Sequence, residues 1–254
     1  MVFSNDDVLR LFGCIDHTSL NATDTVSSVE RFCNDTLELC NALGKNVAAV
    51  CVYPPYVAKA AEVMRGSGIA VASVACGFPS AQMPLRLKLD EVRYILESGA
   101  TEVDMVISRG DIIEGNIVKA FDEIAAVREL CITQKLKVIL ETGELKTEAN
   151  ITAAAQTAIA AGADFIKTST GKIPAGASVE AAEIMLKILT NNSYISQKPI
   201  GFKASGGIST IEQAMEYVDL TRLLLGDQYF NKQYFRIGAS RLTNKIYELL
   251  SQKK

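Results

Sequence analysis

The stretch GADFIKTSTGK, residues 162–172, begins as a buried parallel strand, with Phe165 and Ile166 in an apolar run. Lys167 then occupies a position where another aliphatic residue is expected, and a polar segment follows it. Burying an ammonium group is costly unless the group is paired or loses its charge. A lysine at the end of such a strand therefore needs either partners or a chemical task.

Similar short apolar strands alternate with amphipathic helical segments along the 254 residues. This alternation predicts a parallel sheet with helices outside it. Eight strand–helix units favour closure into a (β/α)8 TIM barrel over a doubly wound sheet, and no Gly-x-Gly-x-x-Gly follows an early strand. We expect one domain over residues 1–254. The predicted strands cover residues 14–18, 47–53, 70–76, 102–107, 137–142, 164–168, 200–204 and 234–238.

Three local predictions are specific enough to test. A further helix over about residues 5–13 is predicted before the first strand, and residues 223–225 compete with 234–238 for the eighth. Ser27 and Glu30 have the spacing of a capping box for the helix that follows the first strand.

Charge and composition exclude several classes of protein. With 26 basic and 29 acidic residues and no basic patch, the chain is not expected to bind nucleic acid. The acidic start MVFSNDDVLR does not resemble a signal peptide, and no apolar run reaches the ~18 residues of a membrane span. We expect a soluble cytoplasmic protein without membrane partners. His17 is the only histidine, which excludes a zinc or iron site built on several histidines, and we predict no metal.

The predicted inward face of the barrel carries unusual charges. Because side chains alternate along a strand, Asp104 lies on the face opposite to Val103 and Met105 and is expected to point toward the barrel axis. Lys167 and Lys203 lie near the carboxyl ends of the sixth and seventh strands, and Lys137 opens the fifth. Since consecutive strands are neighbours in a barrel, these four side chains are expected to meet at the end where TIM barrels carry their active sites.

This arrangement favours amine chemistry. Two ammonium groups about 4 Å apart repel by roughly 4 kcal/mol at an effective dielectric constant near 20, which favours the loss of one proton. A neutral lysine amine attacks carbonyl groups and forms a Schiff base. A carboxylate such as Asp104 can then transfer protons.

Two other motifs lead elsewhere and are set aside. The letters STGK resemble a nucleotide-binding P-loop, but Ile173 follows Lys172 and Ile166 stands where the first glycine belongs. Glu141 and Glu144 in LETGEL have the residue types of an acid–base pair, but we interpret them as loop structure at the barrel mouth.

Eight motifs in order along the chain give a closer resemblance. They are IDHTSLN from Ile15, AAVCVYP, GFP from Gly77, EVDMVI, LETGEL, GADFIKTSTGK, GFKASGGI and RIGAS from Arg236. Together they resemble the deoxyribose-phosphate aldolases, class I aldolases with a (β/α)8 barrel. The lysine segment is the most specific of them.

The resemblance implies a lyase that reversibly cleaves 2-deoxy-D-ribose 5-phosphate to D-glyceraldehyde 3-phosphate and acetaldehyde, with no metal or organic cofactor. It makes Lys167 the Schiff-base lysine, with Asp104 and Lys203 as partners in proton transfer and pKa tuning. The partners of the protein would be this sugar phosphate and the aldehydes, and we expect a homodimer. The supporting polar shell would comprise Asp16, Thr18, Lys137 and Thr170.

A phosphate site is expected where glycines follow the last three strands, because the loops after strands seven and eight usually bind phosphate in this fold. Its predicted members are Gly171, Lys172, Gly206, Gly207, Gly238 and Ser240. The family often has two serines after the final Gly-Ala, whereas here Ser240 is followed by Arg241.

Three alternatives stay open at this point. The first is another Schiff-base aldolase or a transaldolase acting on a different phosphorylated sugar. The others are a sugar-phosphate-binding barrel without catalysis and a lysine enzyme that uses pyridoxal phosphate. Release of acetaldehyde from the substrate separates the first alternative from the main prediction.

Overall fold

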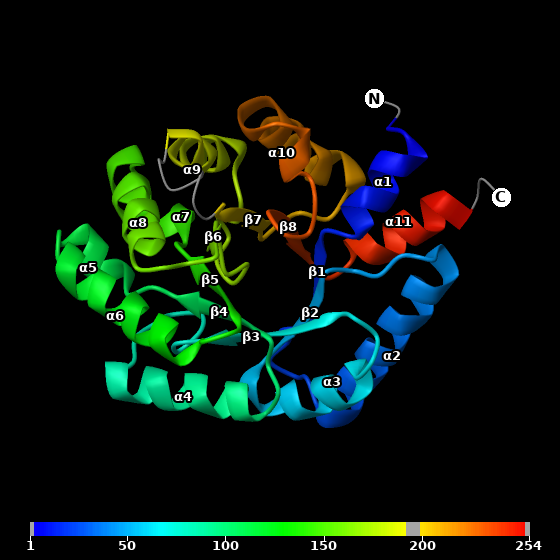
Figure 1. Ribbon diagram of the computed structural model, residues 1–254, viewed down its shortest axis with the longest axis horizontal. Helices are drawn as coiled ribbons and strands as arrows, with labels where there is room; N and C mark the ends of the chain where they lie inside the picture. Colours follow the sequence, from blue (N-terminus) through cyan, green and yellow to red (C-terminus); the bar gives the residue numbers. More distant parts are fainter. Residues whose placement is uncertain (1–2, 192–198, 252–254) are drawn as a thin grey trace.

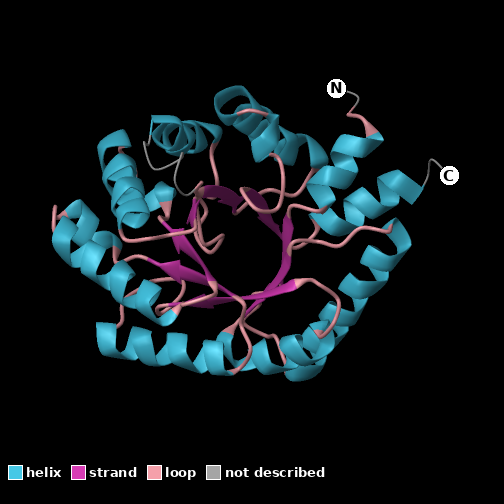
Figure 2. Cartoon of the chain, viewed as in Figure 1, coloured by secondary structure: helices cyan, strands magenta, loops and turns pink. Residues whose placement is uncertain are grey.

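A computed structural model describes residues 3–191 and 199–251 of the chain, and within them eight parallel strands close into a barrel surrounded by helices (Figures 1 and 2). The strands follow one another around the barrel in chain order, and β8 pairs with β1. The predicted (β/α)8 barrel is therefore confirmed. The strands are β1 Ile15–Thr18, β2 Ala49–Val52, β3 Ala70–Ala75, β4 Glu102–Val106, β5 Lys135–Ile139, β6 Phe165–Lys167, β7 Gly201–Ser205 and β8 Phe235–Ala239.

The helices form the outer layer of the barrel (Figure 2). The predicted N-terminal helix is present as α1, whose first turn is capped by the Ser4 side chain. None of the helices in the described ranges is both long and apolar enough to cross a membrane. The α-helices are α1 Asn5–Phe12, α2 Val26–Leu43, α3 Val57–Met64, α4 Leu85–Glu97, α5 Arg109–Ile113, α6 Ile117–Leu130, α7 Thr142–Leu145, α8 Glu148–Ala160, α9 Val179–Asn191, α10 Ile211–Leu225 and α11 Leu242–Ser251; the 3-10 helices are η1 Pro54–Tyr56 and η3 Asp227–Tyr229.

Some predicted boundaries need correction. The fifth strand ends at Ile139 rather than at residue 142, because Glu141 adopts a left-handed backbone conformation and α7 begins directly after it. The predicted capping box of Ser27 and Glu30 is wrong, since Thr25 and Ser28 cap α2 instead. Residues 223–225 lie in α10, so 234–238 was the better prediction for the eighth strand.

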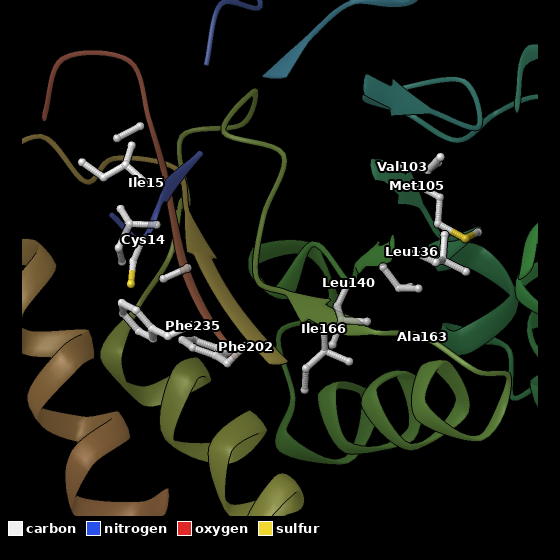
Figure 3. Packing of buried hydrophobic residues seen from close by; sticks show 14 of the residues in the cluster. Cys14, Ile15, Val103, Met105, Leu136, Leu140, Ala163, Ile166, Phe202 and Phe235 are labelled. Carbon is white, nitrogen blue, oxygen red and sulfur yellow. The ribbon is translucent and has the colours of Figure 1, made fainter. Parts of the chain in front are cut away.

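Because side chains alternate along each strand, they fill two separate regions, the core between the barrel and the helices and the inside of the barrel itself. Val103, Met105, Leu136 and Ile166 point outward from β4, β5 and β6 and belong to the main core between barrel and helices (Figure 3). Burying one such side chain stabilises the fold by about 1.5–3 kcal/mol. The alternate residues of the same strands point to the barrel axis, which is where the charged side chains lie.

The amino-terminal end of the barrel is filled by an aromatic ring. Phe165 is fully buried, and a Cβ atom on Gly201 of the neighbouring strand would lie 2.3 Å from its ring. Only glycine therefore fits beside Phe165. Lys167 is the next inward residue of β6 and pairs in register with Lys203 of β7, so both amines lie one layer nearer the carboxyl ends of the strands.

Candidate active site

The structure brings together the four charged residues that the strand pattern singled out. Asp104 of β4 pairs in register with Lys137 of β5, which lies in the middle of its strand rather than at its start. Lys137 donates to Asp104 Oδ1 at 2.9 Å. Lys167 and Lys203 both donate to Asp104 Oδ2 at 2.7 Å. One buried carboxylate thus accepts from three lysines.

A second carboxylate completes the cluster from β1. Asp16, predicted for the polar shell, is fully buried and accepts from Lys137 at 2.9 Å and Lys203 at 2.5 Å. Its other oxygen accepts from Arg236 at 2.5 Å. Arg236 also donates to Glu102, which lies 2.6 Å from the Lys137 amine.

Arg236 is a member of this cluster that the sequence analysis did not assign. It lies on the inward face of β8, in register with Lys203. The alternation rule that found Lys203 also applies to FRIGA, the sequence of β8, and would have placed Arg236 beside it.

The charges of this cluster do not balance when every group is ionised. It contains four basic side chains and three acidic ones, so loss of a single proton makes it neutral. The basic side chains are Lys137, Lys167, Lys203 and Arg236, and the acidic ones are Asp16, Glu102 and Asp104. A buried site favours the neutral total, because excess charge there is poorly solvated.

Local environment determines which lysine loses the proton. Burial lowers the pKa of Lys167, and the positive charge of Lys203 lowers it further, although Asp104 opposes both. Burial also acts to lower the pKa of Lys203, but Asp104 and Asp16 outweigh it and the pKa is raised. Lys137 behaves like Lys203, with its pKa raised well above the ordinary value by Asp104, Asp16 and Glu102 against the effect of burial. Burial, rather than repulsion by Lys203, is thus the larger cause at Lys167.

The carboxylates respond in the opposite sense. Burial acts to raise the pKa of Asp104, yet Lys137, Lys167 and Lys203 together hold it well below the ordinary value. Asp104 is therefore ionised, and it bridges the amine with the lowered pKa and the two amines with raised ones.

A cavity of about 270 Å3 opens above this cluster at the carboxyl ends of the strands, and Lys167 lines it. Lys203 and Lys137 are fully buried and do not line this cavity. Gly238 of β8 leaves room for this packing, since a Cβ atom there would lie 3.2 Å from Lys203 Cε and 2.8 Å from Ser205 Cβ. Lys167 therefore connects the charge cluster to the space where a ligand can bind.

All six residues predicted for the phosphate site line the same cavity as Lys167. They are Gly171, Lys172, Gly206, Gly207, Gly238 and Ser240. Arg241 lines it as well, and no ion pair engages Arg241 within the described part of the chain.

The two predicted threonines also line the cavity, but each has its own local partner. Thr18 donates to the Asp16 carbonyl at 2.8 Å, and Thr170 donates to the buried carboxylate of Glu141. The Lys172 ammonium group donates a hydrogen bond to the Leu20 carbonyl and so connects the loops that follow β6 and β1.

Comparison with known proteins identifies the family of this chain. The family model described as "DeoC/LacD family aldolase" matches residues 11–242. The chain belongs to the DeoC/LacD aldolase family. Its sequence is 40% identical to a curated deoxyribose-phosphate aldolase of Bos taurus and 39% identical to that of Homo sapiens, in each case over 251 residues that cover 94% of this chain and 79% of the relative.

Solved structures extend the likeness to this aldolase. One is a putative deoxyribose-phosphate aldolase from Coccidioides immitis, with a TM-score of 0.79 and 32% identity, covering 94% of this chain and 86% of that one. Another is a deoxyribose-phosphate aldolase from Aeropyrum pernix described as having a unique tetrameric structure, with a TM-score of 0.74 and 25% identity, covering 99% and 100% of the two chains. The chain is therefore an aldolase, a lyase of the TIM-barrel class.

Proposed function

We propose that this aldolase cleaves 2-deoxy-D-ribose 5-phosphate to D-glyceraldehyde 3-phosphate and acetaldehyde, and catalyses the reverse addition, through a Schiff base on Lys167. The observation that carries the proposal is the contrast within one cluster. Of its four basic side chains, Lys167 alone lines the cavity and alone has a lowered pKa. Titratable neighbours whose pKa values diverge in this way are typical of acid–base sites.

The chemistry follows from a neutral amine at Lys167. The amine adds to the C1 aldehyde of the open-chain sugar, and the hydroxyl of the resulting carbinolamine takes up a proton and leaves as water, which gives an iminium ion. Removal of the proton from the C3 hydroxyl lets the C2–C3 bond break, and its electron pair moves through C2 and C1 to the nitrogen. D-glyceraldehyde 3-phosphate leaves. The remaining enamine is protonated at C2, and water releases acetaldehyde and restores the amine.

Asp104 and Lys203 are assigned to proton transfer and to the tuning of Lys167. Asp104 contacts the Lys167 amine directly, so it can take up or return a proton as the nitrogen changes charge. Lys203 shares the same oxygen of Asp104 and remains charged, which supports the neutral form of Lys167.

The phosphate group is assigned to the loops after β6, β7 and β8. Their glycines let backbone N–H groups approach an anion, and Arg241 adds a positive charge at the cavity wall. Several charged hydrogen bonds lost together should lower kcat/KM for unphosphorylated 2-deoxyribose by about 100-fold or more.

Two assays test the proposal. The first measures acetaldehyde release from 2-deoxy-D-ribose 5-phosphate in the presence of a chelator. Release without added metal supports the reaction, whereas transfer of a carbon fragment without free acetaldehyde supports the transaldolase alternative. The second reduces the enzyme with borohydride in the presence of acetaldehyde. Added mass on the peptide that contains Lys167 is expected, and labelling of Lys203 or of neither lysine refutes the assignment.

The same proposal has the enzyme act in the cytoplasm as a homodimer, without metal or organic cofactor. The relative from Aeropyrum pernix is described as tetrameric, so the assembly differs within the family if this chain is dimeric. Light scattering on the purified protein decides between the two.

A further inference from the structure

Glu141 is a buried carboxylate that the proposed reaction does not use. It follows β5, its side chain is almost fully enclosed, and its backbone is left-handed with φ 57° and ψ 61°. A residue with a Cβ atom rarely adopts this conformation, which glycine would take without strain. Such strain at a buried polar residue is typical of a functional constraint.

The contacts of Glu141 lead directly to the cavity. Both carboxylate oxygens lie within reach of the Thr170 backbone N–H, at 3.3 and 3.2 Å, and one of them accepts from the Thr170 hydroxyl. The Thr170 oxygen accepts in turn from the Lys172 backbone N–H at 3.1 Å. Because the hydroxyl has one proton and donates it to Glu141, its oxygen is turned to receive Lys172.

No ion pair in the described ranges neutralises Glu141. The nearby guanidinium of Arg109 instead pairs with Glu144 at 2.6 Å. A buried carboxylate without a cation is poorly suited to stabilising the fold. Within the described ranges, the carboxylate accepts hydrogen bonds from Thr170 alone, so its effect falls on the loop of residues 168–172. This loop follows Lys167 and contributes Gly171 and Lys172 to the predicted phosphate site.

We propose that Glu141 is a positioning residue, which through Thr170 holds residues 168–172 in the conformation that receives the phosphorylated substrate. The proposal rests on the proposed function for the identity of that substrate. Glu141 does not contact the reacting carbons; it orients the hydroxyl that fixes the backbone of Gly171 and Lys172 along the cavity wall.

The proposal gives a pH signature. Burial raises the pKa of Glu141, and the negative charge of Glu144 adds to the rise, while the hydrogen bonds from Thr170 and the charge of Arg109 oppose it. The ionised form accepts both Thr170 donors, so protonation as the pH falls should release the loop and raise KM in the wild type. Glu141→Gln has no such titration.

The decisive experiment compares Glu141→Gln with the wild type on 2-deoxy-D-ribose 5-phosphate across pH. Glutamine has the size of glutamate, but its NH2 group cannot accept a hydrogen bond. One of the two Thr170 donors, the backbone N–H or the hydroxyl, therefore loses its acceptor. We expect KM to rise on the order of tenfold at neutral pH, since a charged hydrogen bond is lost. Borohydride trapping of acetaldehyde on Lys167 should change less than about twofold, because that probe carries no phosphate. The ratio of the KM of Glu141→Gln to the KM of the wild type should approach one at acid pH. The substrate phosphate titrates near pH 6, but this affects both enzymes alike and cancels from the ratio.

Matched variants isolate the contact. Thr170→Val should raise KM like Glu141→Gln, and the double variant should be no worse than either, because both remove one interaction. Thr170→Ser should restore the wild-type KM. Glu148→Gln, at an exposed position in the first turn of α8, is the control and should leave KM unchanged.

Additive losses in the double variant, equal losses in acetaldehyde trapping, or a wild-type KM in Glu141→Gln would each overturn the proposal. If Glu141→Gln does not fold, the pair Thr170→Val and Thr170→Ser tests the same contact from the other side. Absence of acetaldehyde release by the wild type would instead refute the proposed function, and is thus distinguishable from failure of the Glu141 proposal.

Discussion

At the scale of single residues, the two lysines of β6 and β7 share a carboxylate neighbour but have opposite pKa shifts. Both donate to Asp104, but only Lys203 also donates to Asp16. That second carboxylate keeps Lys203 charged, while Lys167 is left with one carboxylate and the effects of burial and of its charged neighbour. One additional contact therefore separates the proposed nucleophile from its partner.

Replacing Lys203 by methionine should move the pH dependence of the reaction. The charge of Lys203 lowers the pKa of Lys167, so in Lys203→Met that pKa rises and the rising limb of kcat/KM moves to higher pH. At a pH below this pKa, raising the pKa by one lowers the neutral fraction of the amine about tenfold. Lys187→Met, at the surface, is the control; a loss of activity that is uniform at every pH would contradict the tuning role.

Arg241 gives a prediction about specificity. Arg241→Ser should raise KM for the phosphorylated sugar by roughly threefold to tenfold, the scale of one exposed charge, with little change for unphosphorylated 2-deoxyribose. The effect should shrink as salt is added. Lys245→Ser, one turn further along α11, controls for the general loss of positive charge. Equal changes for both sugars would place Arg241 outside the phosphate site.

At the scale of elements, the cap of α2 is open to a direct stability test. The Thr25 and Ser28 side chains each accept from the other's backbone N–H in a capping box. Thr25→Ala should lower the free energy of unfolding by about 1 kcal/mol. Ser27→Ala, at the position that the sequence pattern favoured, should change it by less than about 0.5 kcal/mol. Chemical denaturation of both variants measures the difference, and a larger effect at Ser27 would reverse the assignment of the cap.

The sequence predicted the strands and their inward charges better than it predicted how each element ends. Alternation placed Asp104 and Lys203 on the barrel axis because inward and outward positions repeat every two residues. It extended β5 too far, since Leu140 and Thr142 continue the pattern while the backbone turns at Glu141. It also could not rank Lys167 above Lys203, because access to the cavity depends on loops contributed by distant strands.

At the scale of the whole molecule, the buried charge cluster makes the free energy of unfolding depend on pH. Burial acts to raise the pKa of Asp16, but the charges of Lys137, Lys203 and Arg236 outweigh it and the pKa is lowered. The contribution of Asp16 to the free energy of unfolding is therefore complete above the unfolded pKa of about 3.9, and it is lost as the pH falls through the lower pKa of the folded state. Asp16→Asn should cost about 3–5 kcal/mol at neutral pH. The difference in free energy of unfolding between Asp16→Asn and the wild type should become smaller below about pH 4.

The control for this prediction is a carboxylate of the surface. Asp90 pairs with Arg86 and Arg93, and all three side chains are about half exposed or more. Asp90→Asn should therefore cost less than about 1 kcal/mol at any pH. A constant gap between Asp16→Asn and the wild type from neutral to acid pH would contradict the assignment of acid sensitivity to Asp16.

The ion pair between Asp16 and Arg236 joins residues 220 positions apart, nearly the two ends of the chain. Contacts of such long range form late in folding, because the intervening chain must first be ordered. During refolding, helical signal can therefore return before β8 meets β1, whereas the environment that keeps Lys167 reactive cannot exist until it does. After dilution from denaturant, aldolase activity should therefore return more slowly than the helical circular-dichroism signal. The rate at which activity returns then reports the rate at which the barrel closes.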